Sequence, residues 1–247
     1  MDTTCIFKRI EKKYLLSETQ YEALFWRIGP HLEPDAYGRS TVISLYLDTP
    51  DYRIIRNSIE AVDYKEKLRL RSYGMASTDS MVFLELKKKF DGVVYKRRVS
   101  MTLAQAERYL HLGIKPFDSQ ILSEIDWAMR LYRRPKPKMM IACEREAWYD
   151  EEHPDLRLTF DRSIRCRESE LSLRHSSAGI ALLPEHAVLL EIKTAGAMPL
   201  WLSEALDTVG ILPASFSKYG AAYVRKLEGE NLTVSNIQGG TKYVVNF

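Results

Sequence analysis

The segment at positions 65–71 decides the fold; it reads Lys65-Glu66-Lys67-Leu68-Arg69-Leu70-Arg71. Successive side chains of a β-strand point to opposite faces. A strand here therefore places its four odd-numbered cations on one face and Leu68 and Leu70 on the other. The segment predicts a strand with one apolar face and one cationic face.

The same division recurs along the chain. In the segment 82–89, Glu85, Lys87 and Lys89 alternate with leucines and valine, and in 94–98 the cations Lys96 and Arg98 are in phase. Three more segments show it with the polar sets Arg9, Glu11 and Lys13; Arg157, Thr159 and Asp161; and Glu191 and Lys193. The period of two predicts a sheet in which many strands share one charged face.

Two structures explain such strands. The first is a half-buried antiparallel sheet whose charged face lies in water. The second is a β-barrel whose apolar face points outward under helices, so that the charged face becomes a lumen. Helical spacing is found at 17–28, 103–112, 119–132, 200–209 and after 217, with a short turn at 49–51. These helices need an apolar surface, and the charged face carries mostly Arg and Lys, so we favour the barrel.

A cationic lumen makes a prediction about its contents. Each uncompensated buried ion costs several kcal/mol even after relaxation, so the lumen must hold an anion. A chain of phosphates suits it, because Arg and Lys bind phosphate through charge-assisted hydrogen bonds and a few carboxylates can hold an accompanying divalent metal.

Length and composition bound the remaining possibilities. The 247 residues suit one domain, which we expect at 1–228, followed by a polar C-terminal tail at 229–247. The net charge of +3 is too small for a surface that binds nucleic acid as a whole, so we expect no nucleic-acid partner. No apolar stretch approaches the roughly 20 residues of a membrane span, and the N-terminus lacks a secretory signal. We expect a cytoplasmic protein.

Seven segments in order resemble a known family, the VTC (vacuolar transporter chaperone) domain. They are Glu11-Lys12-Lys13-Tyr14-Leu15-Leu16, Tyr46-Leu47-Asp48-Thr49-Pro50, Lys67-Leu68-Arg69-Leu70-Arg71-Ser72-Tyr73-Gly74, Glu85-Leu86-Lys87, Arg157-Leu158-Thr159-Phe160-Asp161, Leu190-Glu191-Ile192-Lys193 and Phe216-Ser217-Lys218-Tyr219. The resemblance covers roughly 7–226. This domain is the polyphosphate-polymerase branch of the triphosphate tunnel metalloenzymes. The resemblance implies an α+β fold, in which an antiparallel β-barrel forms a tunnel with a cationic lumen and helices packed on the outside.

The resemblance also implies an activity and a site. The activity is transfer of the γ-phosphoryl group of ATP to a growing polyphosphate chain, with Mn2+ or Mg2+. The implied catalytic cations are Lys13, Arg69, Arg71, Lys87, Lys96, Arg157 and Lys218. The phosphate-binding set is Arg145 and Ser217 by resemblance, with Arg98 and Lys193 added because they share the charged faces. The resemblance assigns the metal to Glu191; Glu11 and Glu85 are weaker metal candidates that could instead form ion pairs with lumen cations.

One position departs from the family, because Cys143 stands where an aromatic residue is expected, two residues before Arg145. Two alternative functions also stay open. A hydrolase of inorganic or organic triphosphates could use the same cations, although Arg9 replaces the first glutamate of the Glu-x-Glu-x-Lys strand typical of those enzymes. A non-catalytic polyphosphate or nucleotide sensor is the third possibility. The family implies an integral-membrane partner that would bring the protein to a membrane, and the oligomeric state is left open.

Overall fold

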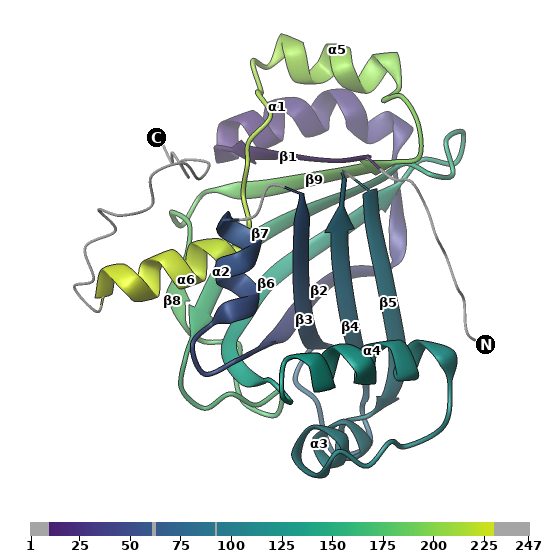
Figure 1. Cartoon of the computed structure of the whole chain (residues 1–247). Coiled ribbons are helices and arrows are strands. Elements are labelled where there is room, and N and C mark those ends of the chain that lie inside the picture. The colour runs from purple at the N-terminus through teal and green to yellow at the C-terminus, as the bar shows by residue number, and fades with distance from the viewer. Residues whose placement is uncertain (1–9, 61–62, 92, 230–247) are drawn as a thin grey trace.

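The computed structural model describes residues 10–60, 63–91 and 93–229 (Figure 1). The first half contains β1 (Ile10–Leu16), α1 (Glu18–Ile28), the short 3-10 helix η1 (Gly29–His31), β2 (Glu33–Asp48), α2 (Arg53–Glu60), β3 (Tyr64–Tyr73), β4 (Met81–Phe90) and β5 (Val93–Thr102). The second half contains α3 (Leu103–Leu112), α4 (Gln120–Leu131), β6 (Lys136–Tyr149), β7 (Arg157–Arg167), β8 (Ile180–Ala181), β9 (Val188–Thr194), α5 (Leu200–Thr208) and α6 (Lys218–Gly229). The α+β class is confirmed.

All the strands belong to one antiparallel sheet, in the order β1-β9-β7-β6-β2-β3-β4-β5, with β8 added beside β7. The sheet bends strongly, so that β1 and β9 cross above the ends of β3, β4 and β5 (Figure 1). The predicted closed barrel needs correction here, because no backbone pairing joins β1 to β5 within the described residues. Side chains fill the gap instead: Lys87 Nζ of β4 lies 2.9 Å from Glu11 Oε2 of β1.

The outward face of the sheet is apolar, as the alternation predicts. Leu68 and Leu70 of β3 are at most 2% exposed and pack with residues of β4, β5, α3 and α4. A second core joins β1, β7 and β9 to α1 and α5, and includes Phe160 and Leu190. Burial of these side chains supplies the main stabilisation of each helix on the sheet. Four helices therefore lie on the outside, as expected.

The other two helices, α2 and α6, lie on the inner face. Tyr46 of β2 and Ile141 of β6 share the cavity-facing side of the sheet with Ser44, and they pack with Ile55 of α2 and Tyr219 of α6. At this end the inner face is apolar and covered by helices, whereas elsewhere it is charged. The sequence pattern did not predict this division of the inner face.

Helix ends follow local chemistry. Ser17 caps α1 in a capping box with Gln20, Ser119 caps α4, and Gly113 ends α3 with a positive φ of 73°. Only a turn was expected at 49–51, but α2 follows it. The buried Asp48 carboxylate stabilises the start of α2 by accepting hydrogen bonds from the backbone N–H groups of Thr49, Ile54 and Ile55 at 2.8–3.0 Å.

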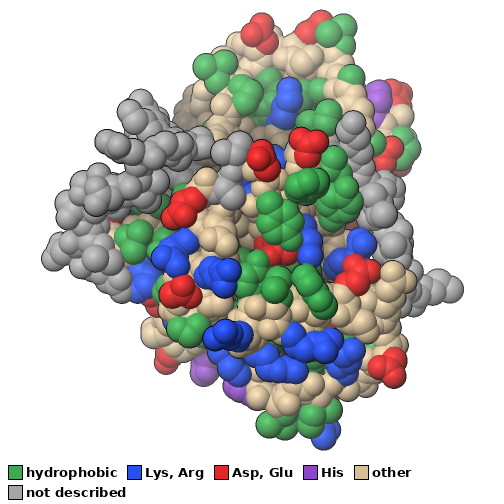
Figure 2. Space-filling view, viewed as in Figure 1, with side chains coloured by type: hydrophobic (Ala, Val, Ile, Leu, Met, Phe, Trp, Pro, Cys, Tyr) green, Lys and Arg blue, Asp and Glu red, His purple; other side chains and the backbone are tan. Residues whose placement is uncertain are grey.

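The outer surface is mixed in charge. Figure 2 shows Lys and Arg side chains grouped over the region of α2 and α4, with carboxylates scattered among them. Within the described ranges, no helix is both long and apolar enough to span a membrane. Cys143 and Cys166 are buried free thiols, whereas Cys5 and the tail at 230–247 lie outside the described residues.

Candidate functional site

The inner face of the bent sheet encloses a cavity of about 1370 Å³, called here the central cavity. Fourteen cationic side chains line it against four carboxylates. The lining includes every predicted catalytic and phosphate-binding residue: Lys13, Arg69, Arg71, Lys87, Lys96, Arg98, Arg145, Arg157, Lys193, Ser217 and Lys218. Glu11 and Glu191 line it too, and Glu85 lies behind its wall with 1% of its surface exposed. The structure thus brings together residues from eight elements that are far apart in the sequence.

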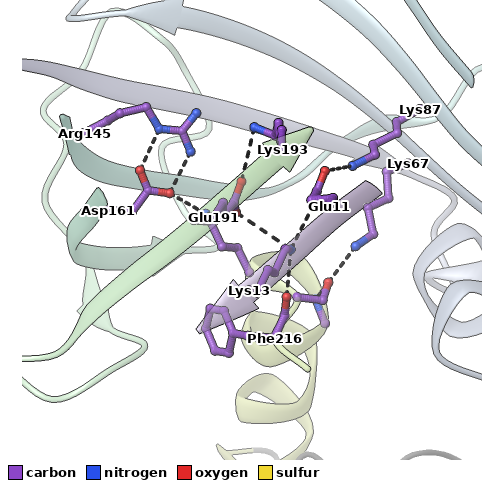
Figure 3. Close-up of polar contacts among 12 residues, drawn as sticks. Glu11, Lys13, Lys67, Lys87, Arg145, Asp161, Glu191, Lys193 and Phe216 are labelled. Atoms are coloured by element: carbon purple, nitrogen blue, oxygen red, sulfur yellow. Dashed lines mark hydrogen bonds and ion pairs between the residues drawn. The ribbon is translucent and has the colours of Figure 1, made fainter. Parts of the chain in front are cut away.

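One charged cluster joins β6, β7, β9 and α6 (Figure 3). Arg145 donates two hydrogen bonds of 2.6 Å to the fully buried Asp161, and Lys218 Nζ lies 2.6 Å from Asp161 and 2.8 Å from Glu191. Burial alone would raise the pKa of Asp161, but Lys218 and Arg145 outweigh it and lower that pKa to about 2. The two cations of this cluster are balanced by its two carboxylates, and the contacts of Lys218 hold the first turn of α6 against the sheet.

A second cluster centres on β1. Lys13 Nζ lies 3.5 Å from Glu11 and 3.7 Å from Glu191, and it donates a 2.9 Å hydrogen bond to the carbonyl oxygen of Phe216. Burial would raise the pKa of Glu191, but Lys218, Lys13 and Lys193 hold it well below its usual range. Both glutamates therefore carry a negative charge that faces the cavity.

The third cluster centres on Glu85 of β4. Its carboxylate accepts a 2.6 Å hydrogen bond from Arg69 and lies 2.8 Å from Lys96 and 3.2 Å from Arg98. Although burial opposes it, the charges of Arg69, Arg71 and Lys96 hold the pKa of Glu85 well below the usual range. Glu85 thus acts as the common counter-ion of three cavity cations, the ion-pair alternative that the sequence had left open.

Among the lining cations that have no such counter-ion, Arg71 and Lys67 lie in the cation row on β3. Arg71 donates a 3.2 Å hydrogen bond to Ser44 Oγ, and Lys67 donates a 2.6 Å hydrogen bond to Ser217 Oγ. Neither has an ion pair with a carboxylate among the described residues. A buried cation without an ion pair costs free energy in the empty cavity. This cost favours an anionic ligand at both positions.

Arg157 of β7 also lines the cavity. Its guanidinium donates to the carbonyl oxygens of Pro154 and Leu156 and lies 5.2 Å from the ring centroid of Tyr149. Lys193, its cross-strand partner on β9, lies 3.6 Å from Glu191. Both side chains can reach an anion in the cavity, but Arg157 is held by neutral groups only.

The side chains around Glu11, Glu85 and Glu191 indicate which of these carboxylates could hold a metal ion. No group of three His, Cys, Asp or Glu side chains suited to a metal ion occurs in the described part of the chain. Glu11 and Glu191 nevertheless converge on the ammonium group of Lys13, which shows that this position attracts a cation. Mg2+ is commonly bound by one or two carboxylates together with substrate phosphates. The pair Glu11 and Glu191 fits that pattern, and Glu85, enclosed by three cations, does not.

Sequence reasoning missed some polar groups of the cavity. Tyr46 accepts a 3.1 Å hydrogen bond from Arg69 and stacks on Tyr219 with ring centroids 4.4 Å apart. Burial would raise the pKa of Tyr46, but Arg69 and Arg71 lower it. Thr159 lines the cavity with a buried hydroxyl that has no hydrogen-bond partner in the described residues. The alternation of strand residues, which places Tyr46 on the same face as Ser44, could have indicated Tyr46.

Comparison with known proteins agrees with this geometry. A putative adenylate cyclase from Bacillus halodurans superposes with a TM-score of 0.54 at 15% identity, covering 85% of this chain and 95% of that one. A putative adenylyl cyclase from Hippeastrum, described as having a dominant triphosphatase activity, has a TM-score of 0.50 at 15% identity, covering 88% and 95%. At these identities the likeness establishes the fold alone.

No curated protein matches the chain significantly by sequence. The model of the VTC domain family, however, matches residues 8–225. This match includes all fourteen predicted site residues, of which thirteen line the central cavity and Glu85 lies behind its wall. The chain belongs to the VTC domain family.

Proposed function

We propose that this protein is a metal-dependent polyphosphate polymerase, which transfers the γ-phosphoryl group of ATP to a polyphosphate chain in the central cavity. One observation carries the proposal: the row of cations is longer than a triphosphate. Lys65, Lys67, Arg69 and Arg71 line the cavity from one strand. At about 6.7 Å for every second residue, the row extends over roughly 20 Å. A chain of phosphates can use all four positions, whereas a single triphosphate cannot.

The cation surplus suits the chemistry. Phosphoryl transfer requires positioning and electrostatic stabilisation of charge on the phosphate oxygens, and no protein nucleophile. Arg69 is held rigidly by Glu85 and Tyr46, so its remaining guanidinium edge is oriented before substrate enters. Arg71 and Lys67 lack ion pairs and would gain most from phosphate contact. We assign these three residues to the binding and orientation of phosphates.

Glu11 and Glu191 are the groups that would hold a divalent ion, Mn2+ or Mg2+, together with phosphate oxygens. When bound, such an ion supplies extra positive charge against the transferring group. Lys13, which now lies between the two carboxylates, would then be released toward a phosphate. The assignment of this pair explains why two acidic side chains are kept in a cationic cavity.

The test is to incubate the purified protein with ATP and Mn2+, and to resolve the products by gel and by assays for ADP and orthophosphate. Long polyphosphate with an equal amount of ADP supports the proposal. A Glu191→Gln variant should lose activity, whereas Glu107→Gln, a matched change at an exposed ion pair with Arg174, should not. Melting curves of both variants separate loss of activity from loss of the fold.

A triphosphate hydrolase is the second candidate, because water can replace the phosphate acceptor without altering most of the cations. The description of the Hippeastrum protein as a triphosphatase favours testing it. Orthophosphate as the only phosphate product would establish hydrolysis. Tight binding of tripolyphosphate without any product would instead establish the sensor.

A further inference from the structure

Lys67 is placed unlike the other lysines at the centre of the cavity. Lys13 and Lys87 each contact Glu11, whereas Lys67 contacts the hydroxyl of Ser217 at the start of α6 (Figure 3). Part of its surface faces the open cavity, where a phosphate could reach it. It is therefore a cavity cation whose present partner is neutral.

The charges around Lys67 come from three elements. Lys13 and Glu11 face it from β1, Arg69 from its own strand β3, and Lys87 from β4. Directly before α6 it meets the uncharged Ser217. Burial and the three neighbouring cations lower the pKa of Lys67 to about 7, and Glu11 only partly offsets them. In the empty cavity near neutral pH, Lys67 is thus charged in only part of the molecules.

We propose that Lys67 is a phosphate-binding residue that takes up a proton from solvent when a polyanion enters the central cavity, and that it then exchanges Ser217 for a phosphate oxygen. This inference rests on the proposed polyanion-binding function, in which Lys67 contacts phosphate, and adds to it the uptake of a proton by that residue. A bound phosphate supplies the negative charge that the surroundings of Lys67 lack, so the ammonium form is favoured once the ligand is present.

The inference sets the pH dependence of binding. An apparent dissociation constant rises as the fraction of competent protein falls. With a pKa of about 7, roughly half of the Lys67 side chains are charged at pH 7 and roughly one-tenth at pH 8. Binding by the unaltered protein should therefore weaken about fivefold over this range, relative to a Lys67→Arg variant. That variant stays charged at both pH values because arginine does not deprotonate in this range.

The experiment is calorimetric titration of the full chain with inorganic tripolyphosphate, without metal, at pH 8 in two buffers of different ionisation enthalpy. The unaltered protein should take up about 0.9 proton more per bound ligand than Lys67→Arg, because about nine-tenths of Lys67 starts neutral. Protonation of the ligand and of other lysines contributes equally to both proteins and cancels in this difference. A purely structural role for Lys67 would not change proton uptake.

Two further variants complete the test. Lys89→Arg makes the same lysine-to-arginine exchange at a cavity lysine on the neighbouring strand β4, and should take up as many protons on binding as the unaltered protein. Lys67→Gln should bind more weakly at pH 7 and lose the extra proton, which keeps the inference testable if the arginine is not accommodated. Equal proton uptake by the unaltered protein and Lys67→Arg would overturn the inference. Failure of the unaltered protein to bind would overturn the proposed function as well, whereas binding without ADP formation would refute only the polymerase.

Discussion

The strongest prediction concerns Asp161, which holds Arg145 and Lys218 together at the centre of the protein. An Asp161→Asn change keeps the size of the side chain but removes its charge, and its amide N–H groups would face the guanidinium of Arg145. The carboxylate is fully buried and accepts both 2.6 Å hydrogen bonds from Arg145. The change thus leaves two buried cations with only Glu191 to balance them.

The magnitude follows from burial and from the pKa. Removing one partner of a buried ion pair typically costs about 3–5 kcal/mol. Because Glu191 still contacts Lys218, we expect the lower end, about 3 kcal/mol, which corresponds to a fall in Tm of roughly 6–12 °C for a chain of this size. Glu107→Gln, at an exposed pair, is the matched control and should cost less than about 1 kcal/mol.

The pH dependence gives an independent check. The pKa of Asp161 is lowered from 3.8 to about 2 in the folded protein, so its ionised form stabilises the fold above pH 4. This stabilisation, about 2 kcal/mol, is lost as the pH falls from 4 toward 2. Urea denaturation followed by circular dichroism at pH 7 and pH 3 measures both effects. If Asp161→Asn unfolds within 1 kcal/mol of the unaltered protein at pH 7, or shows the same acid destabilisation, our account of this cluster is wrong.

Three other predictions follow from the same structure. Arg71→Gln should weaken tripolyphosphate binding about tenfold or more in calorimetry, because it removes a charge-assisted contact with phosphate. It should not lower Tm, because Arg71 has no ion pair in the empty cavity. A lower Tm with intact binding would contradict this. Tyr219→Phe removes one hydrogen bond from the buried Asp48 and should cost about 1.5–3 kcal/mol in urea denaturation, so an unchanged midpoint would count against it. Tripolyphosphate at about 100 times its Kd should stabilise the fold by about 2.7 kcal/mol in thermal melts; an equal shift with sulfate at matched ionic strength would show that the effect is not specific.

Much of the site could be predicted from the sequence, because strand alternation is a local rule. Arg69 and Arg71 share a face wherever the strand lies. In the same way Lys87 shares a face with Lys89 in β4, and Lys96 shares one with Arg98 in β5. Helix boundaries at Ser17 and Gly113 were also local, since a cap needs only neighbours in the chain. These predictions required no knowledge of tertiary contacts.

Other features depended on packing between distant segments. The helix α2 was missed because the group that stabilises its start, Asp48, becomes available only when β2 is buried between β3 and β6. The closed barrel was overpredicted because the alternation of β1 and β5 does not say whether their backbones meet. The metal role of Glu85 was left open for the same reason: its three cations come from β3 and β5.

The sequence by itself determined that a row of cations shares one face and that this face opposes an apolar one, because both follow from the two-residue period of a strand. Only the tertiary structure decided which cations are neutralised. Lys87 meets Glu11 across 76 positions of the chain, and Lys218 meets Glu191 across 27, whereas Lys67 and Arg71 meet only hydroxyl groups. The bending of the sheet brings these partners together, and the interaction between two charges depends on their separation in space and on their burial, not on their separation in the chain.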